Sequence, residues 1–407
     1  MRRLPVVAGA LLLLAACSST SGHGSVVPGS SSARSTPRST RPVPTSSSKT
    51  RPTTSPARTS SPPAPATAEG VLAGMSLRER VGQLLMVDCP TTSVPDATVV
   101  AIRQSHVGSV ILDGTSTAGM GSTQDVTGRL RALAPRGVGL FIATDQEGGL
   151  VQRLQGPGFT RIVSAVEQGG IAPATLQEFA LSWAQQLRQA GVNVNLAPVL
   201  DTVPAGFGSN PPIGDLDRQY GSTPAAVTAH GMAVVRGMTA AGIDVTVKHF
   251  PGLGRTRGNT DLSSGVTDYV TTRDDPYLAP FRAAIAAHVP FVMMSTAIYA
   301  RLDPGTPAAF SPTIVTGLLR HQLGFGGLVI SDDLGNAAQV RGLSVGRRAV
   351  QFVAAGGDVV LTVDATQAAT MTGALVARAQ SDPTFRQQVD AAALLVLQAK
   401  QARGLLG

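Results

Sequence analysis

Eight short apolar segments constrain the fold of this chain more than any other feature. They are LLMVD (84–88), VGSVILD (107–113), VGLFIATD (138–145), VNVNLAPVLD (192–201), IDVTVKHF (243–250), VPFVMMST (289–296), GLVISDD (327–333) and GGDVVLTVD (356–364). The segments are continuously apolar and do not alternate, which is typical of parallel strands that are covered on both faces. Amphipathic stretches separate them, such as 173–191, which has apolar residues at helical spacing and stops at Gly191.

Eight strand–helix units in about 330 residues predict an α/β fold, a (β/α)8 barrel of the TIM type. A doubly wound open sheet is the alternative. Its dinucleotide-binding version is disfavoured because no Gly-x-Gly-x-x-Gly opens a helix after the first apolar segment. No metal-ligand cluster, phosphate-binding loop or cofactor motif is present in the sequence, so we expect neither metal nor cofactor.

Polar residues at or near the ends of six segments stand out. They are Asp88, Asp145, Asp201, Lys248–His249, Asp332–Asp333 and Asp364. In a (β/α)8 barrel the carboxyl ends of all strands meet at one mouth, where active sites are built. Because Asp is a common helix cap, we interpret Asp88, Asp201 and Asp364 as caps or loop residues. The others, apart from Asp333, lie in wider polar or glycine-rich motifs and are candidates for a site.

The N-terminus has the pattern of an export signal. Two Arg precede an apolar run from Leu4 to Ala16, which is too short to remain as a membrane-spanning helix. The run ends in Leu-Ala-Ala-Cys, which resembles the bacterial lipobox, and Cys17 is then the acylated first residue of the mature protein. The alternative is an ordinary signal peptide followed by a chance Cys. Cys89, the only other cysteine, is expected to be a buried free thiol.

The basic charge of the chain belongs to a tail. Residues 1–68 hold eight Arg or Lys and no Asp or Glu, which leaves 25 basic and 25 acidic residues in 69–407. The neutral folded part argues against nucleic-acid binding. Residues 18–68 are almost wholly Ser, Thr, Pro, Gly, Ala and Arg, which predicts a disordered tether. We therefore expect a signal peptide (1–16), an acylated Cys with its tether (17–68) and one catalytic barrel (69–407).

Five motifs, in order, resemble glycoside hydrolase family 3, in particular its single-domain bacterial β-N-acetylglucosaminidases, in a lipoprotein form. They are ATDQEGGLVQRLQGPGFT (143–160), VNVNLAPVLD (192–201), DRQYGSTP (217–224), KHFPG (248–252) and LDPGTPAAFSPTIVTGLLRHQLGFGGLVISDDL (302–334). The likeness covers about residues 72–400. Each motif alone is modest evidence, but the ordered set on the expected strands is highly specific.

The resemblance implies a retaining glycosidase that removes terminal β-linked N-acetylglucosamine, or a related sugar, from cell-wall glycans or muropeptides. It places the carboxylate nucleophile at Asp332, and an oxocarbenium-like transition state does need such a group below the sugar ring. Asp333 is then interpreted as a cap of the next helix. Sugar-binding residues carried over by position are Asp145, Arg153, Arg218, Lys248 and His249.

The loop after KHFPG departs from the family, where an Asp-Ser-His triplet supplies the acid–base His and the Asp that orients it. The aligned residues here are Asn259, Thr260 and Asp261. Further departures are Leu253 for a loop His, Leu150 for an Arg and Thr296 for a His. In one hypothesis Asp261 is the acid–base, carried inward by a mobile glycine-rich loop, with a raised pKa. In the other, hydrolysis is impaired and the protein is a tethered glycan- or muropeptide-binding module.

These patterns also predict where the protein acts. We expect an exported monomer of a bacterium with a GC-rich genome, anchored through lipid on Cys17 at the outer face of the cytoplasmic membrane or in the cell wall. The expected partners are a glycan or muropeptide substrate and the membrane, and no nucleic acid.

Overall fold

The computed structural model describes residues 66–135 and 137–407. The predicted signal peptide, Cys17 and the predicted tether up to residue 65 lie outside this part of the chain. The first described helix, α1, begins at Ala68, and the hydroxyl of Thr67 caps it by accepting a hydrogen bond from the Gly70 N–H. None of the helices within the described ranges is long and apolar enough to cross a membrane.

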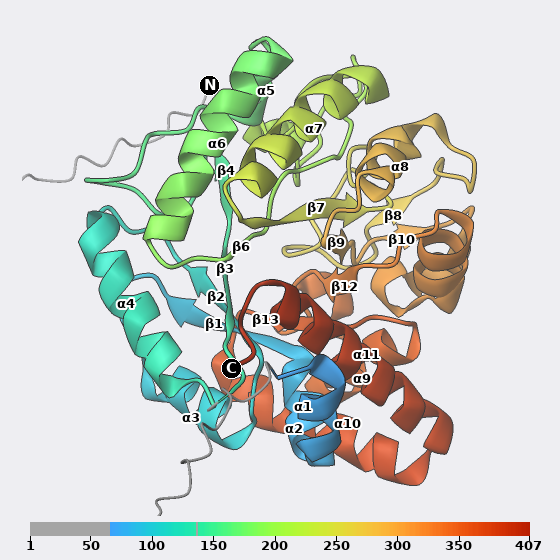
Figure 1. Cartoon of the computed structure of the whole chain (residues 1–407). Coiled ribbons are helices and arrows are strands. Elements are labelled where there is room, and N and C mark those ends of the chain that lie inside the picture. Colours follow the sequence, from blue (N-terminus) through green and yellow to red (C-terminus); the bar gives the residue numbers. More distant parts are fainter. Residues whose placement is uncertain (1–65, 136) are drawn as a thin grey trace, which may run out of the picture. The chain divides into compact units, whose positions relative to one another are not determined.

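Eight parallel strands form the centre of the protein (Figure 1). They are β1 (Leu85–Pro90), β2 (Ser109–Asp113), β3 (Phe141–Thr144), β6 (Val194–Asn195), β7 (Asp244–Phe250), β9 (Phe291–Met294), β12 (Leu328–Ser331) and β13 (Val360–Thr362). Neighbours in the sheet follow chain order, and β1 also pairs with β13. A bridge between Ile330 and Val359 joins β12 to β13, so the sheet closes on itself. The predicted (β/α)8 barrel is confirmed, and each predicted segment overlaps one strand.

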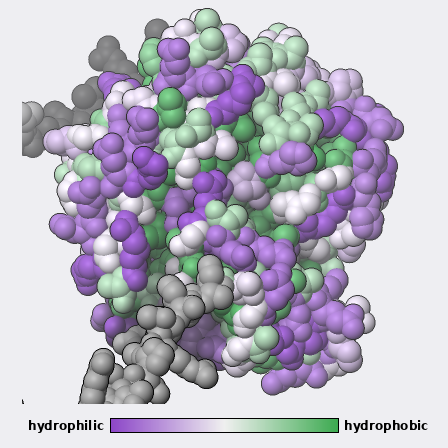
Figure 2. All heavy atoms as spheres, in the orientation of Figure 1, coloured by the Kyte–Doolittle hydropathy of each residue, from purple (hydrophilic) through white to green (hydrophobic). Residues whose placement is uncertain are grey.

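Helices surround the barrel and connect its strands (Figure 1). They are α2 (Leu77–Gln83), α3 (Asp96–Gln104), α4 (Gly119–Leu133), α6 (Pro173–Gln189), α7 (Pro224–Ala240), α8 (Ala279–Ala286), the π-helix η4 (Thr313–Gln322), α9 (Val345–Ala354), α10 (Ala368–Ser381) and α11 (Pro383–Ala402). Helix α6 has Pro173 in its first turn and is followed by Gly191 with a φ of 85°, as its sequence pattern predicts. Figure 2 shows hydrophilic side chains over most of the visible surface, with apolar ones between them.

Short elements decorate the loops. They are α1 (Ala68–Gly74), α5 (Ala165–Gln168), the small strands β4 (Gln146–Gly148), β5 (Val151–Gln152), β8 (Thr267–Asp268), β10 (Ile298–Tyr299) and β11 (Asp303–Pro307), and the 3-10 turns η1 (Gly214–Leu216), η2 (Pro276–Leu278), η3 (Ala308–Phe310), η5 (Ala338–Val340) and η6 (Ala365–Gln367). Strands β4 and β5 form a hairpin directly after β3, and β8, β10 and β11 form a separate three-stranded sheet. Most of these elements follow the carboxyl ends of barrel strands, where they build the rim of the mouth.

Helix α11 packs against the amino-terminal end of the barrel. Its Val396 belongs to the apolar cluster inside the barrel, together with Phe141 and Leu328, which stand near the starts of their strands. Helix α1 packs on α11 in turn, with Ala68 and Leu397 in a shared apolar cluster. The amino-terminal end is therefore covered by helices, and a solvent-accessible site is left to the opposite mouth.

Candidate active site

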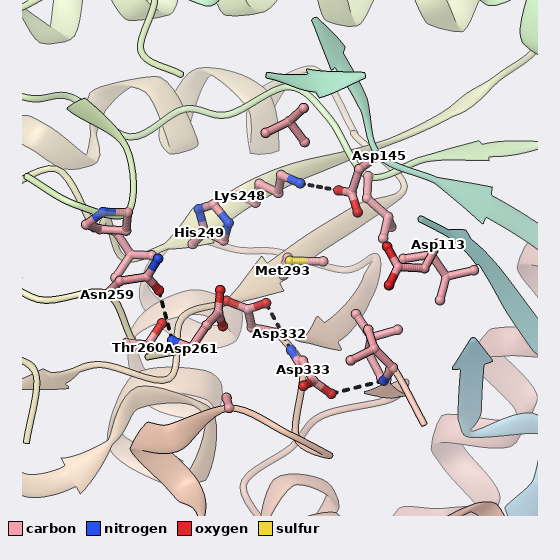
Figure 3. A pocket seen from close by; sticks show the side chains of 18 of the residues that line it. Asp113, Asp145, Lys248, His249, Asn259, Thr260, Asp261, Met293, Asp332 and Asp333 are labelled. Atoms are coloured by element: carbon pink, nitrogen blue, oxygen red, sulfur yellow. Dashed lines mark hydrogen bonds and ion pairs between the residues drawn. The ribbon is translucent and has the colours of Figure 1, made fainter. Parts of the chain in front are cut away.

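A cavity of about 390 Å³ lies at the mouth formed by the carboxyl ends of the strands (Figure 3). All seven barrel residues that the sequence predicts for the site line this one cavity. They are Asp145, Arg153, Arg218, Lys248, His249, Asp261 and Asp332. The structure thus brings the predicted residues together from several loops and strand ends, while the role of each stays a prediction.

Two carboxylates, those of Asp332 and Asp261, lie next to each other in the cavity (Figure 3). Asp332 follows β12, and its Oδ1 accepts a hydrogen bond of 2.9 Å from the Asp333 N–H, which orients the carboxylate. Asp261 is exposed at the mouth but has protein on several sides. Burial by this surrounding protein, with the adjacent Asp332 charge second, raises the pKa of Asp261 to about 6.

Hydrogen bonds fix the loop that carries Asp261. The Asn259 side-chain oxygen accepts a bond of 2.9 Å from the Asp261 N–H and so closes a local turn. The carbonyls of Thr260 and Asp261 accept bonds of 3.0 and 3.1 Å from the backbone of Gln339 and Ala338 in η5. We expected a glycine-rich loop that swings inward, but the structure ties it to the segment after β12. Asp261 therefore stands at the cavity without a loop movement.

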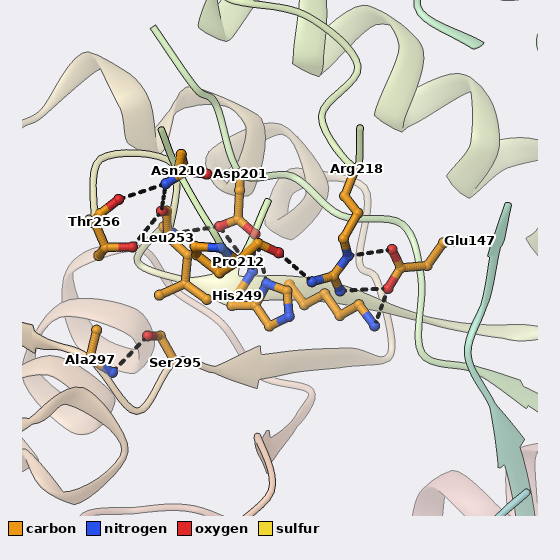
Figure 4. Close-up of polar contacts among 12 residues, drawn as sticks. Glu147, Asp201, Asn210, Pro212, Arg218, His249, Leu253, Thr256, Ser295 and Ala297 are labelled. Carbon is orange, nitrogen blue, oxygen red and sulfur yellow. Dashed lines mark hydrogen bonds and ion pairs between the residues drawn. The ribbon is translucent and has the colours of Figure 1, made fainter. Parts of the chain in front are cut away.

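A buried network of two carboxylates and two cations forms the wall opposite Asp261. Lys248 Nζ lies 2.5 Å from Asp145 Oδ1 and 2.6 Å from Glu147 Oε1. Glu147 also accepts two bonds from Arg218, at 2.7 and 2.8 Å, in the bidentate geometry shown in Figure 4. Burial opposes ionisation of Glu147, but the Arg218 and Lys248 charges hold its pKa below the usual value. Burial likewise opposes the charge on Lys248, and Asp145 and Glu147 raise its pKa.

Arg153 lies beside Asp113 at the rim, with 3.6 Å between Arg153 Nε and Asp113 Oδ1. Asp113 ends strand β2 and lines the cavity, although the sequence did not single it out. The guanidinium and the carboxylate are both part of the cavity wall. Together they present donors and acceptors of the kind that hydroxyl groups of a sugar use.

Asp201 lies in the loop after β6, as one half of its interpretation expected, but it caps no helix. Asp201 is fully buried, and its Oδ2 lies 2.6 Å from Nδ1 of His249 (Figure 4). Its Oδ1 accepts a bond of 2.7 Å from the Leu253 N–H, and both oxygens lie 3.3 Å from the His249 N–H. A usable signal was present: Asp201 ends the apolar segment before the one that ends in His249, and such neighbours pair in a barrel.

The interpretation of Asp333 as a cap of the next helix is also wrong. Its carboxylate accepts bonds from the N–H groups of Gly335, Asn336 and Val363, all in loops, and α9 begins only at Val345. By contrast, Asp364 caps η6 through the Thr366 N–H, and Asp88 accepts from the Ala365 N–H of the same turn. The interpretation of Asp364 is confirmed. Asp88 is instead a residue of strand β1, and its carboxylate reaches the start of η6 from there.

Glu147 was missed because only its neighbours were matched to sugar-binding roles. It lies two residues after Asp145, in the hairpin strand β4, and is 7% exposed. Its position was the signal that would have found it. Glu147 is a charged residue shortly after the barrel strand β3, and Lys248 lies near the end of the barrel strand β7. A buried carboxylate needs cationic partners, and Lys248 and Arg218 supply them.

The family departures have different places in the structure. Leu253 and Thr296 are buried, and Leu253 lines the cavity. Leu150 sits at the tip of the β4–β5 hairpin and is 73% exposed. Cys89 is a buried free thiol, as predicted, and burial raises its pKa to about 12. Within residues 66–135 and 137–407, no group of His, Cys, Asp and Glu is arranged to hold a metal ion.

Comparison with known proteins agrees with the predicted family and fold. The model described as the N terminal domain of glycosyl hydrolase family 3 matches residues 76–399. A β-hexosaminidase of Stenotrophomonas maltophilia (strain R551-3) is 35% identical over 271 residues, which cover 64% of this chain and 77% of that protein.

Two solved structures add to this agreement. The β-N-acetylhexosaminidase of Beutenbergia cavernae DSM 12333 has a TM-score of 0.80 and 48% identity, with 81% of this chain and 99% of that one covered. A family 3 β-N-acetylglucosaminidase of Paenibacillus sp. str. FPU-7 has a TM-score of 0.76 and 33% identity, over 82% of this chain and 63% of that one.

Proposed function

Because the chain belongs to glycosyl hydrolase family 3 and is a glycosidase, we propose that it removes terminal β-linked N-acetylglucosamine, or a closely related sugar, from cell-wall glycans or muropeptides. The proposal is supported by the printed activities of the similar proteins, which are β-hexosaminidases and β-N-acetylglucosaminidases. The cavity volume of about 390 Å³ also lies in the range of small-ligand pockets.

In this proposal Asp332 is the nucleophile. Its carboxylate attacks the anomeric carbon, the bond to the leaving-group oxygen breaks, and a covalent glycosyl-Asp332 intermediate forms. Water then attacks the same carbon and restores the carboxylate, so the sugar leaves with its original anomeric configuration. The bond from the Asp333 N–H holds one oxygen of Asp332, which supports a single orientation for attack.

Asp261 is the acid–base in this proposal. It gives its proton to the leaving-group oxygen in the first step and takes a proton from water in the second. Burial and the Asp332 charge raise its pKa to about 6, so a protonated fraction is present near neutral pH. When the glycosyl-enzyme forms, the Asp332 charge is lost, which favours ionised Asp261 for its role as base.

The remaining cavity residues are proposed to hold the sugar. Asp145 accepts hydrogen bonds from hydroxyl groups, while Lys248, Arg218 and Arg153 donate them. The salt bridges of Lys248 and Arg218 to Glu147 restrict these long side chains before substrate arrives. His249 completes the wall next to the catalytic carboxylates.

The paired carboxylates of Asp332 and Asp261 are the observation that carries the hydrolase proposal. A glycan-binding module without turnover, the alternative from the sequence, has no need of a second carboxylate with a raised pKa on a tied loop. Loss of the family's His is compatible with hydrolysis, since most retaining glycosidases use a carboxylic acid as the acid–base.

A panel of p-nitrophenyl β-glycosides tests the proposal. We expect fastest release of p-nitrophenol from the β-N-acetylglucosaminide, and a loss of at least about 1000-fold in kcat/KM for Asp332→Asn, because the nucleophile is gone. Asp364→Asn is the matched control, since Asp364 also ends a strand at the mouth but only caps η6. Sugar binding by the wild type without turnover would instead support the binding module.

The place of action is part of the proposal. The lipobox-like end of the apolar N-terminal run supports export and a lipid anchor on Cys17. Cys17→Ser should move the protein from the detergent phase to the aqueous phase in a detergent partition of whole cells. If the variant partitions like the wild type, the anchor is not on Cys17.

A further inference from the structure

The buried carboxylate of Asp201 joins three parts of the site (Figure 4). It follows β6, it lies 2.6 Å from the ring nitrogen Nδ1 of His249 at the end of β7, and it accepts a bond of 2.7 Å from the Leu253 N–H. Leu253 begins the loop that carries Asp261. Asp201 is 0% exposed and lies behind His249. It therefore cannot touch a substrate in the cavity and acts on the reaction only through the residues that it holds.

The bond between Asp201 and His249 decides which ring nitrogen of His249 carries the proton. An ionised carboxylate only accepts hydrogen bonds, and both Asp201 oxygens already face N–H groups. Nδ1 of His249 must therefore carry a proton and donate it. Nε2 is then the nitrogen presented to the cavity, as an acceptor when the ring is neutral and as a donor when it is charged.

We propose that Asp201 is a positioning residue for the reaction: it fixes the Nδ1-protonated tautomer of His249 and holds the root of the loop that bears Asp261. This inference rests on the proposed function of the cavity. Carboxylates that orient a functional His by accepting from one ring nitrogen are a recurrent device in enzyme sites. The same side chain thus sets the orientation of the ring both beside the sugar and beside the acid–base.

The groups that face Asp261 make the place of the His249 ring matter. Burial, then Asp332 and Asp333 from the end of β12, raise the pKa of Asp261, whereas His249 from β7 and Arg218 from the loop before α7 lower it. The Asp201 carboxylate, 2.6 Å from Nδ1, holds the His249 ring in its place. A ring that leaves this place lowers the pKa of Asp261 less, so the pKa of Asp261 would rise.

Asp201→Asn separates the two contacts. The amide oxygen still accepts from the Leu253 N–H, but the amide NH₂ now donates to Nδ1 and so places the ring proton on Nε2. We expect kcat/KM to fall about 10- to 100-fold, the size of a lost bond to a charged group. We also expect the alkaline limb of the pH profile to move up by about half a unit. Asp364→Asn should change neither. A folded Asp201→Asn whose limb does not move would overturn the proposal.

The tautomer can be read without any activity. In ¹⁵N-histidine-labelled wild type at pH 8, the His249 ring should carry its proton on Nδ1, with its signals identified by their loss in His249→Gln. A proton on Nε2 in the wild type would contradict the proposal, even if Asp201→Asn fails to fold. This readout also separates the two claims, because an inactive wild type with the Nδ1 tautomer overturns the proposed function alone.

Discussion

At the scale of single residues, the prediction with the largest chemical consequence is that Asp261 stands where the family resemblance places an acid–base His. A carboxylic acid with a pKa of about 6 is protonated below that pH and ionised above it. The alkaline limb of activity on substrates that need a proton should therefore begin near pH 6. The raised pKa depends on burial and on the Asp332 charge, so the two carboxylates act as one unit.

Asp261→Asn should affect substrates unequally. Natural glycosides with poor leaving groups need the proton and should lose about 100-fold or more in kcat, whereas activated dinitrophenyl glycosides need none for glycosylation. Added azide, as an external nucleophile, should partly restore turnover of the activated substrate, because the repelling carboxylate is gone. The measurement is kcat for both substrate types, with and without azide.

The control for this variant is Asp274→Asn, which removes a carboxylate that bonds the Gln322 side chain at the surface. It should leave both substrate types unchanged. Equal slowing of good and poor leaving groups in Asp261→Asn would remove Asp261 from the proton transfer.

The place of a residue at the cavity was predictable where a motif surrounds it. Asp145, Lys248 and Asp332 stand in long matched strings, and all three line the cavity. Glu147 and Asp201 act on other side chains from behind the cavity wall, and such contacts between distant segments leave no local pattern. Only the barrel topology, with β6 beside β7 and β3 one strand further, brings Asp201 to His249 and Glu147 to Lys248.

At the scale of elements, the strands were predictable and the loops were not. Continuous apolar runs with short spacing identify all eight barrel strands. The run at 192–201 contains a strand of only two residues, Val194–Asn195, because Pro198 has no N–H to offer the sheet. Backbone hydrogen bonds join the Asp261 loop to η5. Any sequence could make such bonds, so the glycine content of the loop did not reveal that the loop is held in place.

Helix α11, which covers the amino-terminal end of the barrel, carries a buried lysine, Lys400. Lys400 is fully buried and donates to Gln83 Oε1 at 2.7 Å and to the Gly108 carbonyl at 2.8 Å. Two acceptors match the two N–H bonds of a neutral amine. No salt bridge to a carboxylate is formed by Lys400 in the described part of the chain, and burial lowers its pKa to about 7.

This lysine should make stability depend on pH. The unfolded chain binds a proton at Lys400 up to about pH 10.5, whereas the folded chain releases it above about pH 7. Its contribution to stability is therefore full above pH 10.5 and is lost as pH falls towards 7. Between pH 7 and pH 9 the free energy of unfolding should rise on the order of 2 kcal/mol from this group.

Urea unfolding of wild type and Lys400→Met at pH 7 and pH 9 measures this contribution. Methionine carries no proton. The free energy of unfolding of Lys400→Met minus that of wild type should therefore be larger at pH 7 than at pH 9. An identical pH dependence in the two proteins would mean that Lys400 keeps its charge in the folded state.

At the scale of the whole molecule, the described chain begins on the side opposite the cavity. Helix α1 packs on α11 at the amino-terminal end of the barrel, while Asp332 and Asp261 stand at the carboxyl end. Parallel strands enforce this arrangement, since their two ends are separated by the length of the barrel.

A chain that starts at residue 66 should therefore keep both fold and activity. We expect cooperative thermal unfolding within about 2 °C of the full mature protein, because the apolar clusters lie within the described residues. The kcat/KM for a soluble aryl glycoside should also be unchanged. A large drop in melting temperature would show that residues before 66 pack on the barrel.

Trapping of the intermediate tests the central claim most directly. Asp261→Asn should still form the glycosyl-enzyme from a dinitrophenyl β-N-acetylglucosaminide, but without its general base it should hydrolyse it slowly. Peptide mass spectrometry of the quenched reaction should then find one N-acetylhexosaminyl group on the carboxylate of Asp332. Release of product with no adduct at any time, or an adduct on another residue, would contradict the assignment of Asp332 as the nucleophile beside Asp261.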